Sequence, residues 1–186
     1  MGLREPTEKE LKTIFSAFRA YGFELNGKEI LIREVTRGKN KIKEVILLSK
    51  DLFDFINDSS LPDKFHEKLC FTGIKVGEVG KRFRFSLEGC FYIARKKRKR
   101  VYVNDKGEML FLYGRDLFSI SIVKVTEDVR ENDIVMVCNK DGDILGIGKS
   151  RFDSEVIRSV EADRVVVENL IDRGEYLRKS KLYSAF

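Results

Sequence analysis

The chain has 186 residues, 36 Lys and Arg against 30 Asp and Glu, a formal net charge of +6 and 42% hydrophobic residues. Its 14 Phe, its two Pro and the absence of any low-complexity tract exclude an intrinsically disordered protein, and its length suggests one or two domains. No apolar run approaches the roughly 20 residues that span a bilayer, and the first residues lack the apolar segment of a secretory signal, so we expect a cytoplasmic protein without a membrane partner.

The surplus of positive charge lies in one short segment. Residues 1–94 hold 17 basic and 14 acidic side chains, and residues 101–186 hold 13 basic and 16 acidic ones. The segment between them, here called the basic run, consists only of cations: Arg95, Lys96, Lys97, Arg98, Lys99 and Arg100. Such clusters bind nucleic acid, serve as targeting signals or are merely solvated, and we expect RNA or DNA as the partner.

The first half of the chain predicts a compact α+β unit. Thr7 and Glu10 have the spacing of a capping box, and an apolar stripe at helical spacing follows as far as Gly22, so a helix is expected there. Residues 29–35 and 44–48 predict a hairpin around a polar turn at 37–40. The later elements expected are a helix capped by Ser49 and carrying Ile56, a helix over 61–69, a strand over 69–79, an alternating segment over 82–85 and a helix over 86–94.

From residue 101 onward, short β-type segments separated by turn signals predict a small barrel. The strands expected cover residues 101–103, 109–112, 120–125, 134–138, 144–147 and 164–167. The turn signals between them lie at 104–107, 131–133, 141–142 and 172–174.

Residues that could carry catalysis or hold a metal are few. His66 is the sole histidine, and Cys70, Cys90 and Cys138 are far apart in apolar surroundings, so we expect reduced core thiols, no metal site and no cofactor. The segment 146–150 resembles the end of a phosphate-binding loop, but Asp143 stands where that loop needs its first glycine. We therefore expect a strand at this position and no nucleotide triphosphatase.

A segment after the first barrel strand resembles a known family. Residues 107–114, Gly-Glu-Met-Leu-Phe-Leu-Tyr-Gly, resemble the start of the PUA domain, named after pseudouridine synthases and archaeosine transglycosylases, in the Nip-seven (nuclear import protein seven) family of ribosome biogenesis factors. Further segments resemble family motifs in the expected order: Arg4–Glu10 before the first helix, Gly80–Phe85, Leu145–Gly148 and Asp172–Arg178. The resemblance covers nearly the whole chain and is of the archaeal type.

The resemblance implies both a fold and a function. The fold would be α+β, with an N-terminal α/β pre-PUA domain over 1–94, a C-terminal PUA pseudo-β-barrel over 95–178 and a tail over 179–186. The function would be that of a non-enzymatic RNA-binding assembly factor for the large ribosomal subunit, acting in pre-rRNA processing and binding RNA through the PUA domain. Uridine-rich single strands are the ligand that it suggests. Eukaryotic relatives are nucleolar, with other assembly factors and the exosome as partners.

The resemblance also suggests where RNA would bind. In PUA domains RNA lies against the first helix, which we expect to begin near Gly114 and Arg115. In archaeal relatives, basic residues after the Leu-Gly-x-Gly strand are implicated, and the matching cations are Lys149, Arg151 and Arg158.

We expect residues 95–100 and 149–158 to form one basic surface, in which Arg151 and Arg158, seven positions apart, would share a helix face. Glutamate at Lys97, Arg98 and Lys99 would then weaken RNA binding. The alternative is that the cations of 149–158 are ordinary surface charges paired with Asp153 and Glu155. Glycines at 114, 146 and 148 would allow close approach of a ligand to the backbone, or a positive φ.

Two other classes of function stay open at this point. PUA domains are often appended to catalytic domains, so the chain could be an RNA-modifying enzyme or an accessory subunit, although residues 1–94 lack an obvious catalytic or cofactor motif. A scaffold that binds only proteins, with the basic run as a targeting signal or surface charge, is the other alternative.

Overall fold

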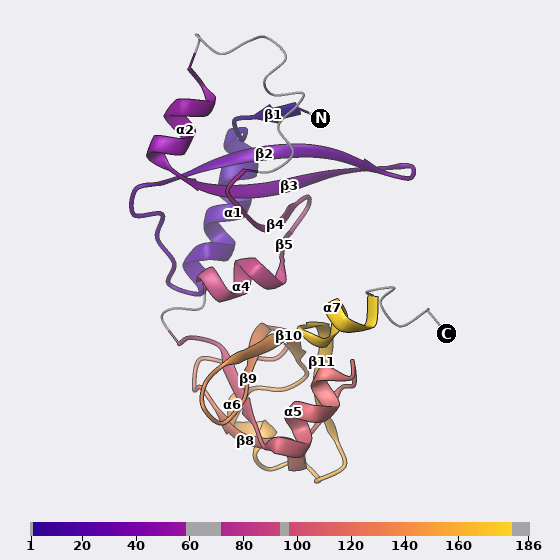
Figure 1. The fold of residues 1–186 in the computed structure, drawn as a ribbon. Helices are drawn as coiled ribbons and strands as arrows, with labels where there is room; N and C mark the ends of the chain where they lie inside the picture. Colours follow the sequence, from indigo (N-terminus) through magenta and orange to yellow (C-terminus); the bar gives the residue numbers. More distant parts are fainter. Residues whose placement is uncertain (1, 59–71, 94–96, 180–186) are drawn as a thin grey trace, which may run out of the picture. The chain divides into compact units, whose positions relative to one another are not determined.

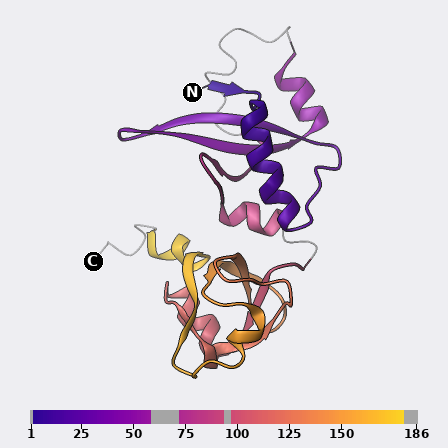
Figure 2. The same ribbon diagram turned by 180° about the vertical axis from the view of Figure 1, so that it is seen from behind.

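The computed structural model describes residues 2–58, 72–93 and 97–179. The chain divides into two compact units, residues 1–96 and 97–186, which are described separately below as the N-terminal and C-terminal units (Figures 1 and 2). The expected helix over 61–69, His66 and Cys70 lie outside the described residues.

The N-terminal unit is built on one antiparallel sheet with the strand order β1-β2-β3-β4-β5. Its described strands are β1 (Gly2–Arg4), β2 (Lys28–Arg37), β3 (Asn40–Ser49), β4 (Ile74–Val79) and β5 (Phe83–Phe85), and its described helices are α1 (Glu8–Ala20), α2 (Lys50–Ile56) and α4 (Leu87–Ile93). The first helix, the hairpin and the helix capped by Ser49 are confirmed, with both hairpin strands longer than expected. The strand expected from residue 69 begins only at Ile74.

Helices lie on opposite faces of this sheet. α1 begins at a complete capping box, in which the Thr7 hydroxyl accepts from the Glu10 amide at 3.3 Å and the Glu10 carboxylate accepts from the Thr7 amide at 2.8 Å. α1 covers one face of the sheet, as Figures 1 and 2 show from the two sides, and its buried Phe18 packs edge-on against Phe83. On the other face, Ile56 of α2 packs with residues of β2 and β3.

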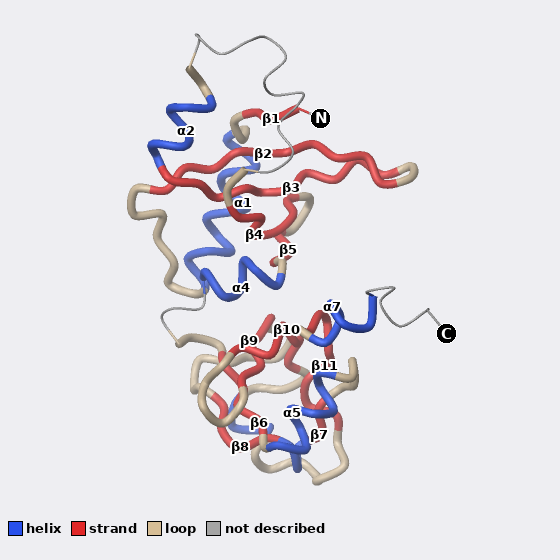
Figure 3. Tube along the Cα trace, viewed as in Figure 1, coloured by secondary structure: helices blue, strands red, loops and turns tan. Residues whose placement is uncertain are grey.

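The C-terminal unit is a near-barrel formed by a sheet with the strand order β7-β11-β10-β9-β6-β8. Among the described residues, β6 and β9 pair in parallel, and the other neighbouring strands pair antiparallel. The strands are β6 (Arg100–Val103), β7 (Leu117–Phe118), β8 (Ile122–Val125), β9 (Ile134–Cys138), β10 (Ile144–Ser150) and β11 (Val165–Asp172). The helices are α5 (Asp105–Leu112), α6 (Ser154–Ile157), α7 (Gly174–Lys179) and the short 3-10 turn η2 (Ser119–Ser121). The predicted pseudo-barrel is confirmed, and Figure 3 shows its strands in red.

One predicted strand of this unit is wrong. Residues 109–112 belong to α5, and the expected turn at 104–107 is its cap and first turn, because the Asn104 side chain accepts from the Gly107 amide at 2.9 Å. The buried Phe111 of α5 packs in the barrel core. The expectation that a helix begins near Gly114 is also wrong: α5 ends at Leu112, and Gly114, with φ 80°, terminates it.

Two further boundaries differ from the sequence expectation. Residues 119–121 form a 3-10 turn, so the strand expected over 120–125 begins at Ile122. β11 continues as far as Asp172, and α7 begins at Gly174, so the turn signal at 172–174 marks a strand-to-helix junction.

Candidate nucleic-acid interface

The basic run has two kinds of side chain in its described part. Lys97 and Arg98 are exposed and make no ion pair with any described residue, whereas Lys99 and Arg100 are turned inward. Lys96 lies outside the described residues. The Lys99 ammonium pairs with Asp133, and the Arg100 guanidinium lies within 3.5 Å of the Gly142 carbonyl oxygen.

The backbone around Lys99 is firmly held, although Lys97 and Lys99 both adopt a positive φ. The Lys99 amide donates to the Asp128 carboxylate at 3.1 Å, and its carbonyl accepts from the Met136 amide at 2.8 Å. Two of the four described cations of the run therefore serve the start of β6, and Lys97 and Arg98 are the ones that face solvent.

The predicted cations Lys149 and Arg151 line one groove of about 640 Å³, here called the β10 groove. Its charged lining residues are Lys149, Arg151, Arg164, Glu131, Asp163 and Glu168. Arg151 pairs with Glu168 at 2.7 Å, not with Asp153 or Glu155, while the Asp153 side chain accepts from the Glu131 amide. Because three carboxylates offset three cations, the groove is polar but close to neutral.

Arg158 lies in a different depression, the β8 pocket, of about 390 Å³. The expectation that Arg151 and Arg158 share a helix face is wrong, since α6 covers only Ser154–Ile157 and Arg151 precedes it. Arg158 donates to the Val125 carbonyl at 3.3 Å, and the other cation of the pocket is Lys124. No carboxylate of the described residues lines this pocket, and the exposed Val123 gives it an apolar side.

The basic run and β10 come together at one acidic turn. Asp133, which pairs with Lys99, also accepts from the Ser150 amide at the end of β10 through its carbonyl at 2.8 Å. Asp133 thus binds Lys99 through its carboxylate and the end of β10 through its backbone carbonyl.

Gly114 and Arg115 form a loop that is held by residues of β11 and α7. The Asn169 amide group donates to the carbonyls of Phe111 at 2.8 Å and of Arg115 at 3.5 Å. A Cβ on Gly114 would meet the Arg178 guanidinium at 3.2 Å. The Arg115 side chain is exposed and makes no ion pair within the described part of the chain, so it is free to meet a ligand.

The three predicted glycines do not act alike. Gly114 has the positive φ that was expected. Gly146 and Gly148 are buried, and a Cβ on them would lie 2.3 Å from the Ile171 carbonyl oxygen and 2.3 Å from the Val167 side chain. These two glycines allow β11 to lie close to β10. They serve strand packing and not the expected contact with a ligand.

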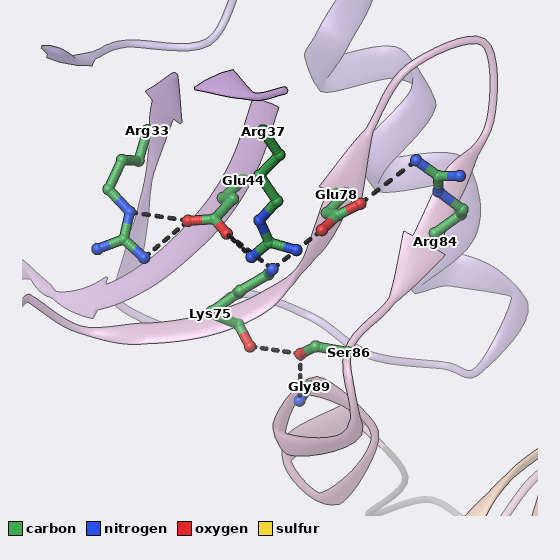
Figure 4. A network of polar contacts seen from close by, with 8 residues as sticks. All are labelled: Arg33, Arg37, Glu44, Lys75, Glu78, Arg84, Ser86 and Gly89. Carbon is green, nitrogen blue, oxygen red and sulfur yellow. Dashed lines mark hydrogen bonds and ion pairs between the residues drawn. The ribbon is translucent and has the colours of Figure 1, made fainter. Parts of the chain in front are cut away.

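A charge network covers part of the N-terminal sheet (Figure 4). It lies on the face that carries α2, because Arg33 and Glu44 share that face with Leu31 and Leu48, which pack with Ile56. The Glu44 side chain is only 3% exposed and pairs with Arg33 at 2.7 Å and with Lys75 at 2.8 Å. Burial opposes its ionisation, but the hydrogen bonds from Lys75 and Arg33 outweigh this effect and hold the pKa of Glu44 below its ordinary value. Lys75 and Arg84 also reach Glu78, so these cations are already neutralised by neighbours.

The described cysteines are buried and form no disulfide. Cys90 and Cys138 are both free and buried, and burial raises the pKa of the Cys138 thiol to about 11. Within residues 2–58, 72–93 and 97–179, no group of three or more His, Cys, Asp or Glu is placed to hold a metal ion. No helix among these residues is long and apolar enough to cross a membrane.

The two units together define a PUA-domain protein with a pre-PUA domain in front. Residues 3–87 match the family model described as the NIP7/UPF0113 pre-PUA domain, and residues 99–181 match the UPF0113 PUA domain. A UPF0113 protein of Archaeoglobus fulgidus is 46% identical over 188 residues, which cover the whole of both chains. The chain belongs to the NIP7/UPF0113 family, as the sequence predicts.

More distant relatives and solved structures agree with this assignment. The 60S ribosome subunit biogenesis protein nip7 of Schizosaccharomyces pombe is 26% identical over 95% of this chain and 97% of that protein. A PUA-domain structure from Aeropyrum pernix K1 matches with a TM-score of 0.67 at 13% identity, over 95% of this chain and 88% of that one. A conserved PUA-domain protein of Thermoplasma acidophilum gives 0.63 at 17% identity, over 95% and 97%. These structures show the likeness of the fold.

Proposed function

We propose that the chain is an RNA-binding assembly factor for the large ribosomal subunit. The observation that carries this proposal is the relation to the fission yeast protein over 95% of this chain. The name of that protein states a role in biogenesis of the 60S subunit, and the matched region includes both units. The chain would act in the cytoplasm by holding pre-rRNA, without catalysis. Other assembly factors and the exosome are its candidate protein partners.

The C-terminal unit would bind the RNA, and exposed cations support this. Lys97, Arg98 and Arg115 lack ion-pair partners within the described residues, and the β8 pocket combines Arg158 and Lys124 with an apolar side. Cations meet phosphates while apolar surface meets bases, which suits a single strand such as uridine-rich RNA. Lys149 and Arg151 would contribute from the β10 groove, where Arg151 must leave or share Glu168.

The test is a salt titration of binding to poly(U). Lys97→Glu with Arg98→Glu should weaken binding and reduce the log–log salt slope by about 1.4, because each phosphate contact on a single strand contributes about 0.7. A matched control, Lys50→Glu with Lys106→Glu, reverses two exposed charges elsewhere and should keep the slope. Lys99 is left intact because glutamate there would face Asp133 and Asp128.

Two outcomes would contradict the proposal. No binding of the wild-type chain to poly(U) or to pre-rRNA fragments at low salt would favour a scaffold that binds only proteins. A mass shift in RNA incubated with the protein would indicate an RNA-modifying enzyme instead of an assembly factor.

A further inference from the structure

The hairpin of β2 and β3 ends in a projecting basic arm, defined here as residues 35–43. β1 pairs with β2 only at residues 32–34, and β4 pairs with β3 only at residues 44–47, so no described strand lies on either side of the arm (Figure 1). It contains Arg37, Lys39, Lys41 and Lys43 and no acidic residue. The outer part of the hairpin is therefore a cationic two-stranded ribbon in which residues 36–41 are exposed, and Arg37 is paired with Glu44 at 3.2 Å.

The base of the arm borders a concave surface of about 610 Å³, here called the arm pocket. The pocket lies at the start of α1, and residues of β1, the arm and the turn after β4 also line it. Its charged lining consists of five cations, Arg4, Lys9, Lys41, Lys43 and Lys81, and one carboxylate, Glu10. Unlike the β10 groove, this surface has a clear surplus of positive charge.

Glu10 does not neutralise that surplus. Its carboxylate, 8% exposed, accepts from both terminal nitrogens of Arg4, from the Lys43 ammonium and from the Thr7 amide, each at 2.8 Å. With these donors its acceptor positions are occupied, so it can offer little to further lysines. It acts as an anchor that fixes Arg4 and Lys43 in the wall of the pocket, where their side chains stay 33% and 43% exposed.

The remaining three cations have no such partner. Lys9, Lys41 and Lys81 come from α1, the arm and the turn after β4, and each is exposed and without an ion pair among the described residues. On the α2 face of the same sheet, by contrast, Arg33 and Lys75 are paired with Glu44. Three unpaired ammonium groups that surround one concavity favour an anionic ligand.

The chemistry of the surface favours a nucleic acid over a protein. Protein interfaces depend on apolar and aromatic anchors at their centre. The exposed large hydrophobic residues described in the N-terminal unit are Phe55, Ile74 and Phe91, and none of them lines the arm pocket. Lysines as point charges around a polar concavity suit phosphate groups.

We propose that the arm pocket and the basic arm form a second RNA-binding site, which holds the phosphate backbone through Lys9, Lys41 and Lys81. This inference rests on the proposed function, that the chain binds RNA, and adds that the N-terminal unit shares the RNA with the C-terminal unit. The site recognises negative charge and has no preference for an RNA sequence, because the groups that it binds are backbone phosphates.

The test compares two triple variants of the full chain. Lys9→Gln, Lys41→Gln and Lys81→Gln removes the unpaired cations of the pocket. The control, Arg19→Gln, Lys28→Gln and Lys50→Gln, removes the same charge from the same unit at the opposite ends of α1 and of the β2–β3 hairpin. Binding to poly(U) and to a mixed-sequence RNA is measured against salt, and thermal unfolding shows that both variants stay folded.

The pocket variant should bind both RNAs about 10- to 100-fold more weakly at about 0.1 M salt, with a log–log slope reduced by about 2, whereas the control should keep the slope of the wild type. Equal slopes for the pocket variant and the wild type would overturn the second site while leaving the proposed function intact. An equal loss in both variants would also overturn it, because the effect would then come from net charge. If the wild type binds neither RNA, the proposed function itself fails.

Discussion

Asp172 and Arg178 form a bidentate ion pair that holds α7 against the end of α5. The two terminal nitrogens of Arg178 donate to the two carboxylate oxygens at 3.0 and 2.8 Å, and one of them also donates to the Leu112 carbonyl. Gly174 lies against the same carbonyl, since a Cβ there would approach it at 1.9 Å. Asp172 and Arg178 are the first and last residues of the segment that resembles a family motif. In this structure the segment supports the Gly114 loop.

Removal of Asp172 should therefore destabilise the C-terminal unit. Its side chain is 2% exposed, and Asp172→Ala would leave Arg178 without its carboxylate at the barrel edge. Because Arg178 is partly exposed, we expect a loss of about 2 kcal/mol, below the 3–5 typical of a fully buried pair. Denaturant unfolding measures this loss. Lys140→Gln, which breaks an exposed pair with Asp105, is the matched control and should leave the unfolding midpoint unchanged.

Gly146 should not accept a side chain. A Cβ there would lie 2.3 Å from the Ile171 carbonyl oxygen and 2.7 Å from the Asp172 Cα, both backbone atoms that cannot move aside. Gly146→Ala should lower the free energy of unfolding by about 2–3 kcal/mol, as overpacking in a close-packed site does. Gly80→Ala serves as the control, because its nearest neighbour would be 4.0 Å away. Equal midpoints for the two variants in thermal unfolding would contradict this account of β10.

The sequence predicts a helix or strand of this fold more reliably where the residue pattern that indicates it is longer. α1 has a capping box and a full apolar stripe, and the helix that these signals predict, between Thr7 and Gly22, is close to the observed one. Residues 109–112 form an apolar run of four, too short for its periodicity to separate helix from strand. The signal that could have decided it was Asn104 as a helix cap, followed by Asp105 and Glu108 in the first turn.

The candidate sites show what sequence cannot supply. A run of cations in a sequence shows how much charge is present but not where each side chain points. Lys99 and Arg100 turn inward because β6 begins there. The arm pocket gathers residues that are far apart in the chain, and β1 pairing and the position of α1 bring them together. Its one local signal was the absence of acidic residues between 35 and 43.

The N-terminal unit should lose stability in acid. Hydrogen bonds from Arg4 hold the pKa of Glu10 well below its ordinary value, and Lys75 and Arg33 lower that of Glu44. Groups with a lowered folded pKa stabilise fully above the unfolded value, about 4.3 for Glu, and lose this contribution as the pH falls toward the folded value. Unfolding free energies should therefore fall below about pH 4.

The variant Glu10→Gln isolates this effect. It should be less stable than the wild type at pH 7, because Arg4 and Lys43 lose their shared carboxylate. Its stability should fall less than that of the wild type between about pH 5 and pH 3, since the titrating group is gone. Denaturant titrations across this range measure both differences. A parallel fall in both proteins would show that Glu10 does not titrate with folding.

The buried thiols should resist alkylation while the protein is folded. Burial raises the pKa of Cys138 to about 11 and raises that of Cys90 further, so only about 0.1% of Cys138 is thiolate at about pH 8. Iodoacetamide should therefore modify Cys90 and Cys138 slowly in native buffer and rapidly in denaturant, with the sites resolved by peptide mass spectrometry. The denatured chain supplies the reference rate for each cysteine. Fast native modification of Cys138 would show that β9, which lies inside the sheet between β10 and β6, opens readily, against the burial seen here.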